Sequence, residues 1–250
     1  MTGSLPGPSA WAPHGTADPP RSRAALAILI GGLTGANIAR TMWVPGPWHF
    51  WFNLGIGAFS AGVAIGARVT RDELGLARDR LRRGLSLGGR VAGAIAVGVV
   101  ALGAAGLLTD ERTEVSAASM ATRTLVLIPL GTVLVEEMAF RGSLHALLGR
   151  FGRGPTLDGP RLLRGATALQ WIGGSILFGL WHTVPALRGG GIDSDVVEVS
   201  SLATALATTA ATTVAGAGFI WLRVRSGSLL APVLVHLATN SVTFAVAWAF

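Results

Sequence analysis

The chain has 250 residues, of which 50% are hydrophobic and only 13% are charged, and its formal net charge is +7. Its apolar runs are too long and too numerous for the core of a soluble protein, so the composition excludes an ordinary soluble enzyme. The absence of cysteine excludes disulfides, a thiol nucleophile and thiolate metal ligands. All 20 basic residues are arginines, and most lie in loops between apolar runs, as membrane orientation requires, so we expect no nucleic-acid partner.

Residues 1–23 are rich in Pro, Gly and Ser and predict a disordered N-terminal tail. Seven apolar segments follow, each a predicted membrane helix, at residues 24–39, 50–67, 91–109, 124–148, 168–187, 200–222 and 229–249. We therefore predict an all-α, polytopic transmembrane helix bundle of about seven spans. It divides into N-terminal transmembrane helices over 24–109 and a core over 124–249. The basic stretch 68–90 is either an amphipathic helix on the inner surface or a solvated loop.

The distribution of arginine between the loops predicts how the chain is oriented. With the N-terminus placed inside, the inner segments carry fifteen arginines, and the outer segments carry four, including Arg40. This asymmetry follows the positive-inside rule. It predicts a multi-pass protein of the plasma membrane, with its N-terminus in the cytoplasm and its C-terminus outside.

Two adjacent carboxylates, Glu136 and Glu137, end an apolar run that begins at Thr124, and Arg141 follows them. A carboxylate at membrane depth costs at least a few kcal/mol, so such residues almost always face a partner or a cavity. Glu137 and Arg141 are four residues apart, which predicts an ion pair on one helix face. Glu136 points about 100° away from that pair and is free to act as a general base on a water molecule.

Two further predicted spans carry polar residues, His182 in one and the pair His236 and Asn240 in the other. At a rise of about 1.5 Å per residue, all these groups fall in one layer, from the inner half of the bilayer to its middle. His182 is suited to hold the water or move its proton, and His236 and Asn240 to bind a developing oxyanion. Other interpretations are packing for the histidines, an interhelical hydrogen bond for Asn240, and a structural role or a proton relay for the glutamates.

Three motifs lie in order on three predicted spans: Glu136-Glu-Met-Ala-Phe-Arg141, Phe178-Gly-Leu-Trp-His182 and His236-Leu-Ala-Thr-Asn240. With Ser226-Gly-Ser-Leu-Leu-Ala-Pro232 before the last motif, residues 124–245 resemble the CAAX prenyl protease and bacteriocin-processing (CPBP) family, also called the Abi family. The resemblance implies an intramembrane endopeptidase with its protease core over 124–249 and its site open to the cytoplasm. It implies that Glu136 and His182 activate water and that His236 and Asn240 form the oxyanion hole. Phe178 is a packing residue or a substrate contact.

The family has been described both as metalloproteases and as glutamate-type proteases. The chain has no HExxH motif, which favours a reaction that requires no cofactor; a zinc ion held by Glu136, His182 and His236 is the alternative. The expected partners are the lipid bilayer and a membrane-associated peptide or protein substrate. Eukaryotic members cleave prenylated C-terminal tripeptides, whereas this composition resembles that of high-GC bacteria. Two other functions fit the same residues: a non-catalytic bacteriocin self-immunity protein and a proton-coupled transporter.

Overall fold

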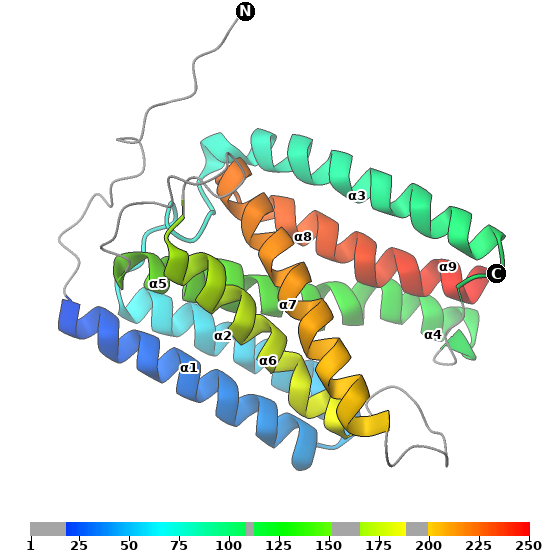
Figure 1. Ribbon diagram of the computed structural model, residues 1–250, viewed down its shortest axis with the longest axis horizontal. Helices are drawn as coiled ribbons and strands as arrows, with labels where there is room; N and C mark the ends of the chain where they lie inside the picture. The colour runs from blue at the N-terminus through cyan, green and yellow to red at the C-terminus, as the bar shows by residue number, and fades with distance from the viewer. Residues whose placement is uncertain (1–18, 109–112, 152–165, 189–199) are drawn as a thin grey trace, which may run out of the picture.

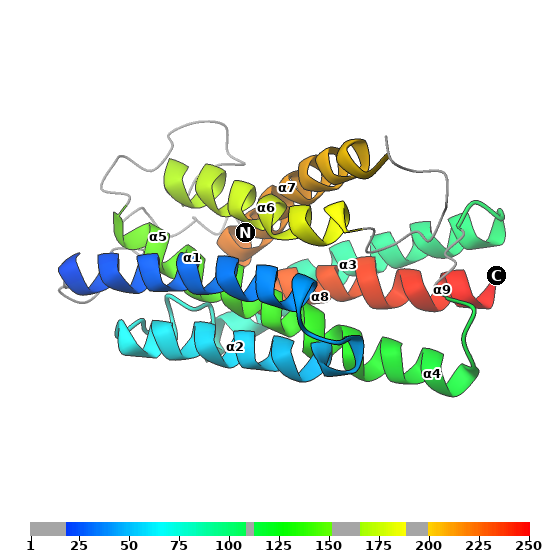
Figure 2. The ribbon, with the colours of Figure 1, turned by 90° about the horizontal axis from the view of Figure 1, so that it is seen from below.

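The computed structural model describes residues 19–108, 113–151, 166–188 and 200–250, and these residues form an all-α bundle (Figures 1 and 2). Of the predicted N-terminal tail, residues 1–18 lie outside the described residues. The first helix begins at Pro19, within the stretch predicted as tail. Prolines suit this position, because the first turn of a helix can spare their missing N–H groups.

The N-terminal part of the chain contributes three long helices and two short 3₁₀ turns. Their bounds are α1 Pro19–Met42, η2 Gly46–Trp48, α2 His49–Gly66, η3 Arg78–Arg80 and α3 Leu81–Ala104. Because α1 continues to Met42, Arg40 lies in the last turn of a helix and not in the outer loop that the sequence predicts.

The remaining helices carry the three motifs. Their bounds are α4 Ala117–Thr122, η5 Arg123–Leu127, η6 Pro129–Leu134, η7 Glu137–Leu144, α5 His145–Phe151, η8 Leu169–Gly173, α6 Gly174–Leu187, α7 Ser200–Ser226, α8 Leu230–Leu237, η9 Ala238–Val242 and α9 Thr243–Ala249. Elements η5 to η9 are wide, π-type turns, which are rare in proteins and often mark functional sites. Residues 117–151 form one helix of 35 residues through α4, the three wide segments and α5.

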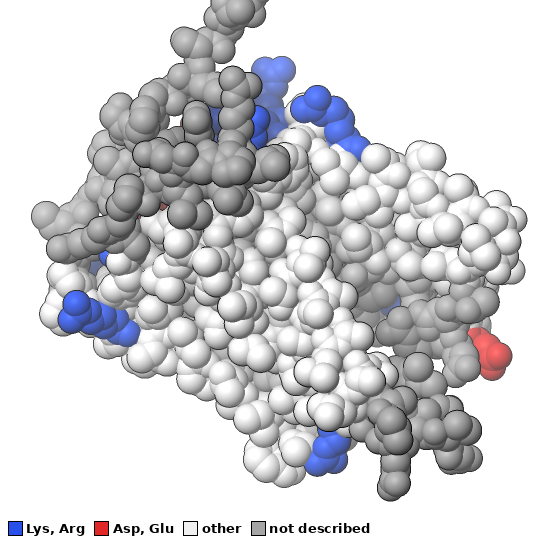
Figure 3. Space-filling model, viewed as in Figure 1, with Lys and Arg blue, Asp and Glu red and all other residues white. Residues whose placement is uncertain are grey.

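Five helices of the described residues are long and apolar enough to cross a membrane: Pro19–Met42, Arg78–Ala104, Ala117–Phe151, Leu202–Ser226 and Leu230–Ala249. Figure 3 shows a broad face without charged side chains, with the basic and acidic side chains of the described residues near its margins. The predicted all-α transmembrane bundle is confirmed. The count of seven is not, because α2 and the helix formed by η8 and α6 are not among these five.

Glycines allow the helices that carry the second and third motifs to pack closely on their neighbours. A Cβ atom on Gly179 of α6 would overlap Thr213 of α7 and lie 2.7 Å from the carbonyl oxygen of Thr209. A Cβ atom on Gly88 of α3 would lie 2.7 Å from the Cα atom of Ala231 of α8. Because neither position has a side chain, the backbones of α6 and α7, and of α3 and α8, approach directly.

The basic stretch 68–90 takes neither of the two forms that the sequence predicts. Its first part is a turn packed on the bundle, with Val69 and Leu74 buried, and its last part, from Leu81, is the beginning of α3. Glu73 orders the turn by accepting hydrogen bonds from the backbone N–H and the hydroxyl of Thr70, at 2.8 and 3.0 Å. The turn therefore belongs to the folded body of the protein.

Candidate active site

The deepest part of the polar cluster is the ion pair that the spacing predicts. Arg141 donates from Nη1 to Oε1 of Glu137 at 3.1 Å, and the two side chains are 1% and 0% exposed. His236 of α8 contacts the same oxygen through Nδ1 at 2.9 Å. An oxygen beside a guanidinium belongs to a carboxylate, so we assign Nδ1 of His236 as the donor. This carboxylate therefore joins α8 to the helix of the first motif.

Aromatic rings enclose these buried charges. The guanidinium carbon of Arg141 lies 3.8 Å from the ring centroid of Phe178 and 4.7 Å from that of Phe219. Phe219 also stacks on His236, with 4.8 Å between ring centroids. Ring faces stabilise a cation that has lost its water. Phe178 is buried beneath the guanidinium, and its contact with substrate stays a prediction.

Glu136, next in the chain, has a different environment. Its Oε1 accepts a hydrogen bond from Nε1 of Trp181 at 3.2 Å, whereas its Oε2 is buried and has no hydrogen-bond partner among the described residues. Oε2 lies 4.0 Å from Nε2 of His182 and 3.9 Å from Nε2 of His236. These distances are too long for direct hydrogen bonds and suit a bridging water molecule.

The backbone determines which nitrogen of His182 faces Glu136. Its Nδ1 lies 2.8 Å from the carbonyl oxygen of Phe178, one turn earlier on α6. A carbonyl oxygen only accepts, so Nδ1 carries the hydrogen, and Nε2 of the neutral ring presents a lone pair towards Glu136. The His182 side chain is 27% exposed, against 10% for Glu136 and 5% for His236, so His182 is the most accessible of the three.

The structure brings five of the six predicted catalytic residues into this cluster. The sixth, Asn240, is half-buried on η9, where its Oδ1 accepts a 3.4 Å hydrogen bond from Thr239. Within the described parts of the chain, no hydrogen bond joins Asn240 to the carboxylates or the imidazoles. Its place in the oxyanion hole stays a prediction.

Three residues near the cluster were missed by the sequence reasoning. Trp181 carried a signal, because the N–H of a buried tryptophan usually pairs with an acceptor. Phe219 lies on α7, where no motif indicates it. Arg40 is close enough for its charge to act on Glu136, and its buried Nε has no partner among the described residues.

We tested whether Glu136, His182 and His236 fit a zinc ion. Zinc ligands lie about 2.0–2.2 Å from the metal, which places the ligand atoms of a tetrahedral site about 3.4 Å apart. The separations of 4.0 and 3.9 Å from Oε2 of Glu136 are wider than this. Across the described residues, no group of three or more His, Cys, Asp or Glu side chains has the arrangement of a metal site. The side chains as they stand therefore do not fit zinc.

Fold and site together define a multi-pass membrane protein with a buried carboxylate–imidazole cluster. Residues 118–242, half of the chain, match the family model of the type II CAAX prenyl endopeptidases, Rce1-like, and the chain belongs to this family. No curated protein and no solved structure matches it. The match confirms the resemblance to the CPBP family and includes all six predicted catalytic residues. Membership supports a CAAX protease-type function within a lipid bilayer, on a membrane-associated substrate.

Proposed function

We propose that the protein is an intramembrane endopeptidase that hydrolyses peptide bonds of membrane-associated proteins or peptides with a water molecule activated by Glu136 and His182. The observation that carries this proposal is the buried Oε2 of Glu136, which has no hydrogen-bond partner in the described parts of the chain and lies 4.0 Å from Nε2 of His182. An anionic oxygen and an imidazole lone pair at this distance are two acceptors for the two hydrogens of one water.

In the reaction, Oε2 of Glu136 takes one proton from the water while His182 holds the other hydrogen. The water oxygen bonds to the carbonyl carbon of the substrate, and the electron pair of the broken π bond moves to the carbonyl oxygen. The tetrahedral intermediate then expels the amine, and Glu136 returns its proton to the leaving nitrogen. The same carboxylate thus acts first as base and then as acid, and no covalent intermediate is required.

The developing oxyanion needs donors opposite the base, and His236 and Asn240 supply them in this proposal. Because Nδ1 of His236 donates to Glu137, its Nε2 donates only when the ring is an imidazolium. Glu137 at 2.9 Å and Glu136 at 3.9 Å balance that positive charge. Arg141 acts through Glu137, which it holds against His236, so we assign it a positioning role.

The test uses the full-length protein in liposomes with two sets of quenched fluorescent peptides, one farnesylated with a CAAX-type C-terminus and one unprenylated with an apolar segment. We expect cleavage of at least one set, and we expect Glu136→Gln to lower kcat by about 10²–10⁴, the range of general acid–base catalysis. Treatment with a strong chelator should leave the rate unchanged. Undiminished cleavage by Glu136→Gln would contradict the proposal, as would substrate flux without cleavage.

We also propose that the membrane is the plasma membrane, with the N-terminus in the cytoplasm and the C-terminus outside. Support comes from the positive-inside pattern and from Arg150 and Arg223, which both bind the turn at residues 67–77, at one end of the bundle. The chain has no cysteine, so single-cysteine variants report position without background. A membrane-impermeant maleimide should label Glu114→Cys in intact cells, and Arg78→Cys only after permeabilisation. The reverse pattern would invert the orientation.

A further inference from the structure

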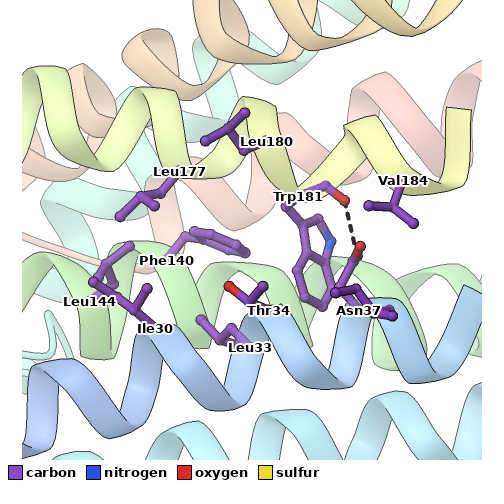
Figure 4. Close-up of a pocket in the computed structure, with 11 residues that line it drawn as sticks. Ile30, Leu33, Thr34, Asn37, Phe140, Leu144, Leu177, Leu180, Trp181 and Val184 are labelled. Atoms are coloured by element: carbon purple, nitrogen blue, oxygen red, sulfur yellow. Dashed lines mark hydrogen bonds between the residues drawn. The ribbon is translucent and has the colours of Figure 1, made fainter. Parts of the chain in front are cut away.

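The carbonyl group of Trp181 lacks its normal partner in the helix. In a regular helix, the N–H four residues later donates to this oxygen, but that position in α6 is Pro185, which has no N–H. The side chain of Asn37 on α1 takes over this bond and donates from Nδ2 to the carbonyl oxygen of Trp181 at 2.9 Å (Figure 4). Asn37 is only 3% exposed, so the bond is made in a protected environment. A hydrogen bond that Pro185 removes from α6 is thus restored from a different helix.

The side chain of the same Trp181 reaches the proposed general base. Its Nε1 donates to Oε1 of Glu136 at 3.2 Å. An indole is a donor only, so it engages one carboxylate oxygen and leaves the other, Oε2, facing His182 and His236. Through this bond, the indole selects both the oxygen that meets the water and the rotamer of the carboxylate.

Trp181 packs against the core on one side and borders a pocket on another. Beside it, α1 and α6 are separated by a pocket of about 180 Å³, with Trp181 and Asn37 among the residues that line it and mostly aliphatic side chains around them (Figure 4). A side chain that borders a pocket is less restrained than one in a close-packed core. The ring of Phe140, 5.7 Å away between centroids, restrains one side of the indole. The two hydrogen bonds therefore contribute much of the order of Trp181.

We propose that Trp181 is a positioning residue for Glu136, and that Asn37 holds Trp181 in place through the carbonyl group that Pro185 leaves unpaired. The inference rests on the proposed role of Glu136 as general base. It extends the site to α1, a helix outside the residues that match the family model. Trp181 does not touch the water in this arrangement; it acts through the carboxylate.

The first test compares two tryptophans that differ in their hydrogen bonds. Trp181→Phe removes the donor to Glu136, whereas Trp221→Phe removes an Nε1–H that has no hydrogen-bond partner among the described residues. With the farnesylated and apolar peptides in liposomes, we expect Trp181→Phe to lower kcat about 10- to 100-fold with KM within about threefold, as expected when a catalytic group is misplaced. We expect Trp221→Phe to leave both constants within about threefold. An equal loss in the two variants, or no loss in Trp181→Phe, would overturn the proposal.

The second test is a rescue experiment. A role of Asn37 in packing alone does not predict this rescue. Asn37→Ala leaves the carbonyl group of Trp181 unpaired, and we expect kcat to fall about 5- to 30-fold. Adding Pro185→Ala supplies a backbone N–H in α6 that donates to this carbonyl group. We therefore expect the double variant to recover to within about threefold of Pro185→Ala alone. A double variant as impaired as Asn37→Ala would refute the part assigned to Asn37 and Pro185.

Glu136→Gln, measured in the same liposomes, separates this inference from the proposed function. If Glu136→Gln retains full activity, the general base is misassigned and the proposed mechanism fails. If Glu136→Gln is inactive while Trp181→Phe keeps the wild-type kcat, the mechanism stands and only the positioning role fails. Thermal unfolding of each variant in detergent identifies any loss of rate that comes from unfolding. If Trp181→Phe unfolds, the recovery of kcat in the Asn37→Ala, Pro185→Ala double variant tests the positioning role instead.

Discussion

Two arginine–glutamate pairs lie at different levels of this bundle, and they satisfy their hydrogen bonds very differently. At one end, Arg150 binds both oxygens of Glu73, at 2.8 and 2.9 Å, and also donates to Ser22 and to the carbonyl oxygens of residues 67 and 68. In the interior, the side chain of Arg141 makes one hydrogen bond among the described residues, to Glu137 at 3.1 Å. Within the described residues, Nη2 of Arg141 and Oε2 of Glu137 are buried without partners.

The difference distinguishes a structural pair from a pair within the candidate active site. Buried polar atoms in folded proteins are almost always paired, so a group of unpaired ones needs an explanation. Oε2 of Glu136 belongs to the same group as the unpaired atoms of Glu137 and Arg141, and no such atom occurs at Arg150 or Glu73. In the proposed mechanism, these interior atoms form hydrogen bonds with water and substrate. The outer pair uses its hydrogen bonds to hold the turn after α2 against α5.

The largest effect that separates the two pairs is expected from Arg141→Met. This substitution leaves Glu137 as a buried carboxylate without its cation, and breaking a buried pair in this way costs about 3–5 kcal/mol of folding free energy. Cleavage should also fall sharply, because His236 loses the carboxylate geometry that positions it. Equilibrium unfolding in mixed detergent micelles measures the first effect, and liposome cleavage measures the second.

The matched control removes both charges. In the double variant Glu137→Gln, Arg141→Met, an amide oxygen still accepts from Nδ1 of His236, and no unpaired charge is buried. We expect it to recover most of the lost stability but not the activity. Equal stability of the single and double variants would show that the unpaired buried charge of Glu137 is not the cause of the lost stability.

At the outer pair, Glu73→Gln should cost about 1–2 kcal/mol, because a charge-assisted, two-pronged contact with Arg150 is lost from a partly buried site. Activity should stay within about threefold, since this pair does not touch the cluster. Asp72→Asn is the control: its contact with Arg80 is 2.8 Å long, but the Asp72 side chain is 55% exposed, so we expect less than about 0.5 kcal/mol. Equal losses in the two variants would remove the distinction between a structural pair and a surface pair.

The sequence could predict that the interior polar residues lie together, because each polar side chain costs free energy when it is placed in the membrane. Glu136, Glu137 and Arg141 interrupt an otherwise apolar segment, and the two histidines stand out in their own spans for the same reason. A polar residue within a membrane span is therefore expected to have a hydrogen-bond or ion-pair partner. Spacing along one helix then placed Arg141 on Glu137.

What the sequence could not predict depends on contacts between distant helices or on local backbone geometry. Glu73 and Arg150 are 77 residues apart, and in a basic stretch nothing marks one glutamate as the partner of one particular arginine. The bond of Trp181 to Glu136 depends on how α6 is rotated about its axis. The wide turns of η7 and η9 have no signal in the order of apolar residues, because a π-type turn differs from an α-helical one by a single hydrogen-bond register.

Glu136→Gln tests the comparison through the sign of its effect on the free energy of unfolding. If the interior carboxylate is kept unpaired for catalysis, replacing it with a neutral amide of the same shape should leave the protein as stable as wild type, or up to about 1 kcal/mol more stable, while cleavage is lost. Glu73→Gln should instead lower stability and preserve cleavage. Both measurements use the same unfolding and liposome assays. A clear loss of stability in Glu136→Gln would mean that Glu136 is a structural group like Glu73.

The smallest effect concerns pH and isolates the outer pair. Burial alone would raise the pKa of Glu73, but the hydrogen bonds from Arg150 and Thr70, with the positive charge of Arg150, outweigh it, so the pKa lies below its ordinary value of 4.5. A lowered pKa in the folded state means that the ionised carboxylate stabilises the fold. This contribution is fully present above pH 4.5 and is lost as the pH falls through the lowered value.

The difference in unfolding free energy between wild type and Glu73→Gln should therefore be constant from neutral pH down to about pH 5, and should shrink at lower pH. Unfolding in micelles at a series of pH values measures it, and Asp72→Asn should show little change over the same range because its partner contact is exposed. A difference that grows on acidification would mean that the pKa of Glu73 is raised. Arg150 would then be too weak a partner to offset the burial of the carboxylate, and the turn after α2 would depend on its buried Val69 and Leu74 instead.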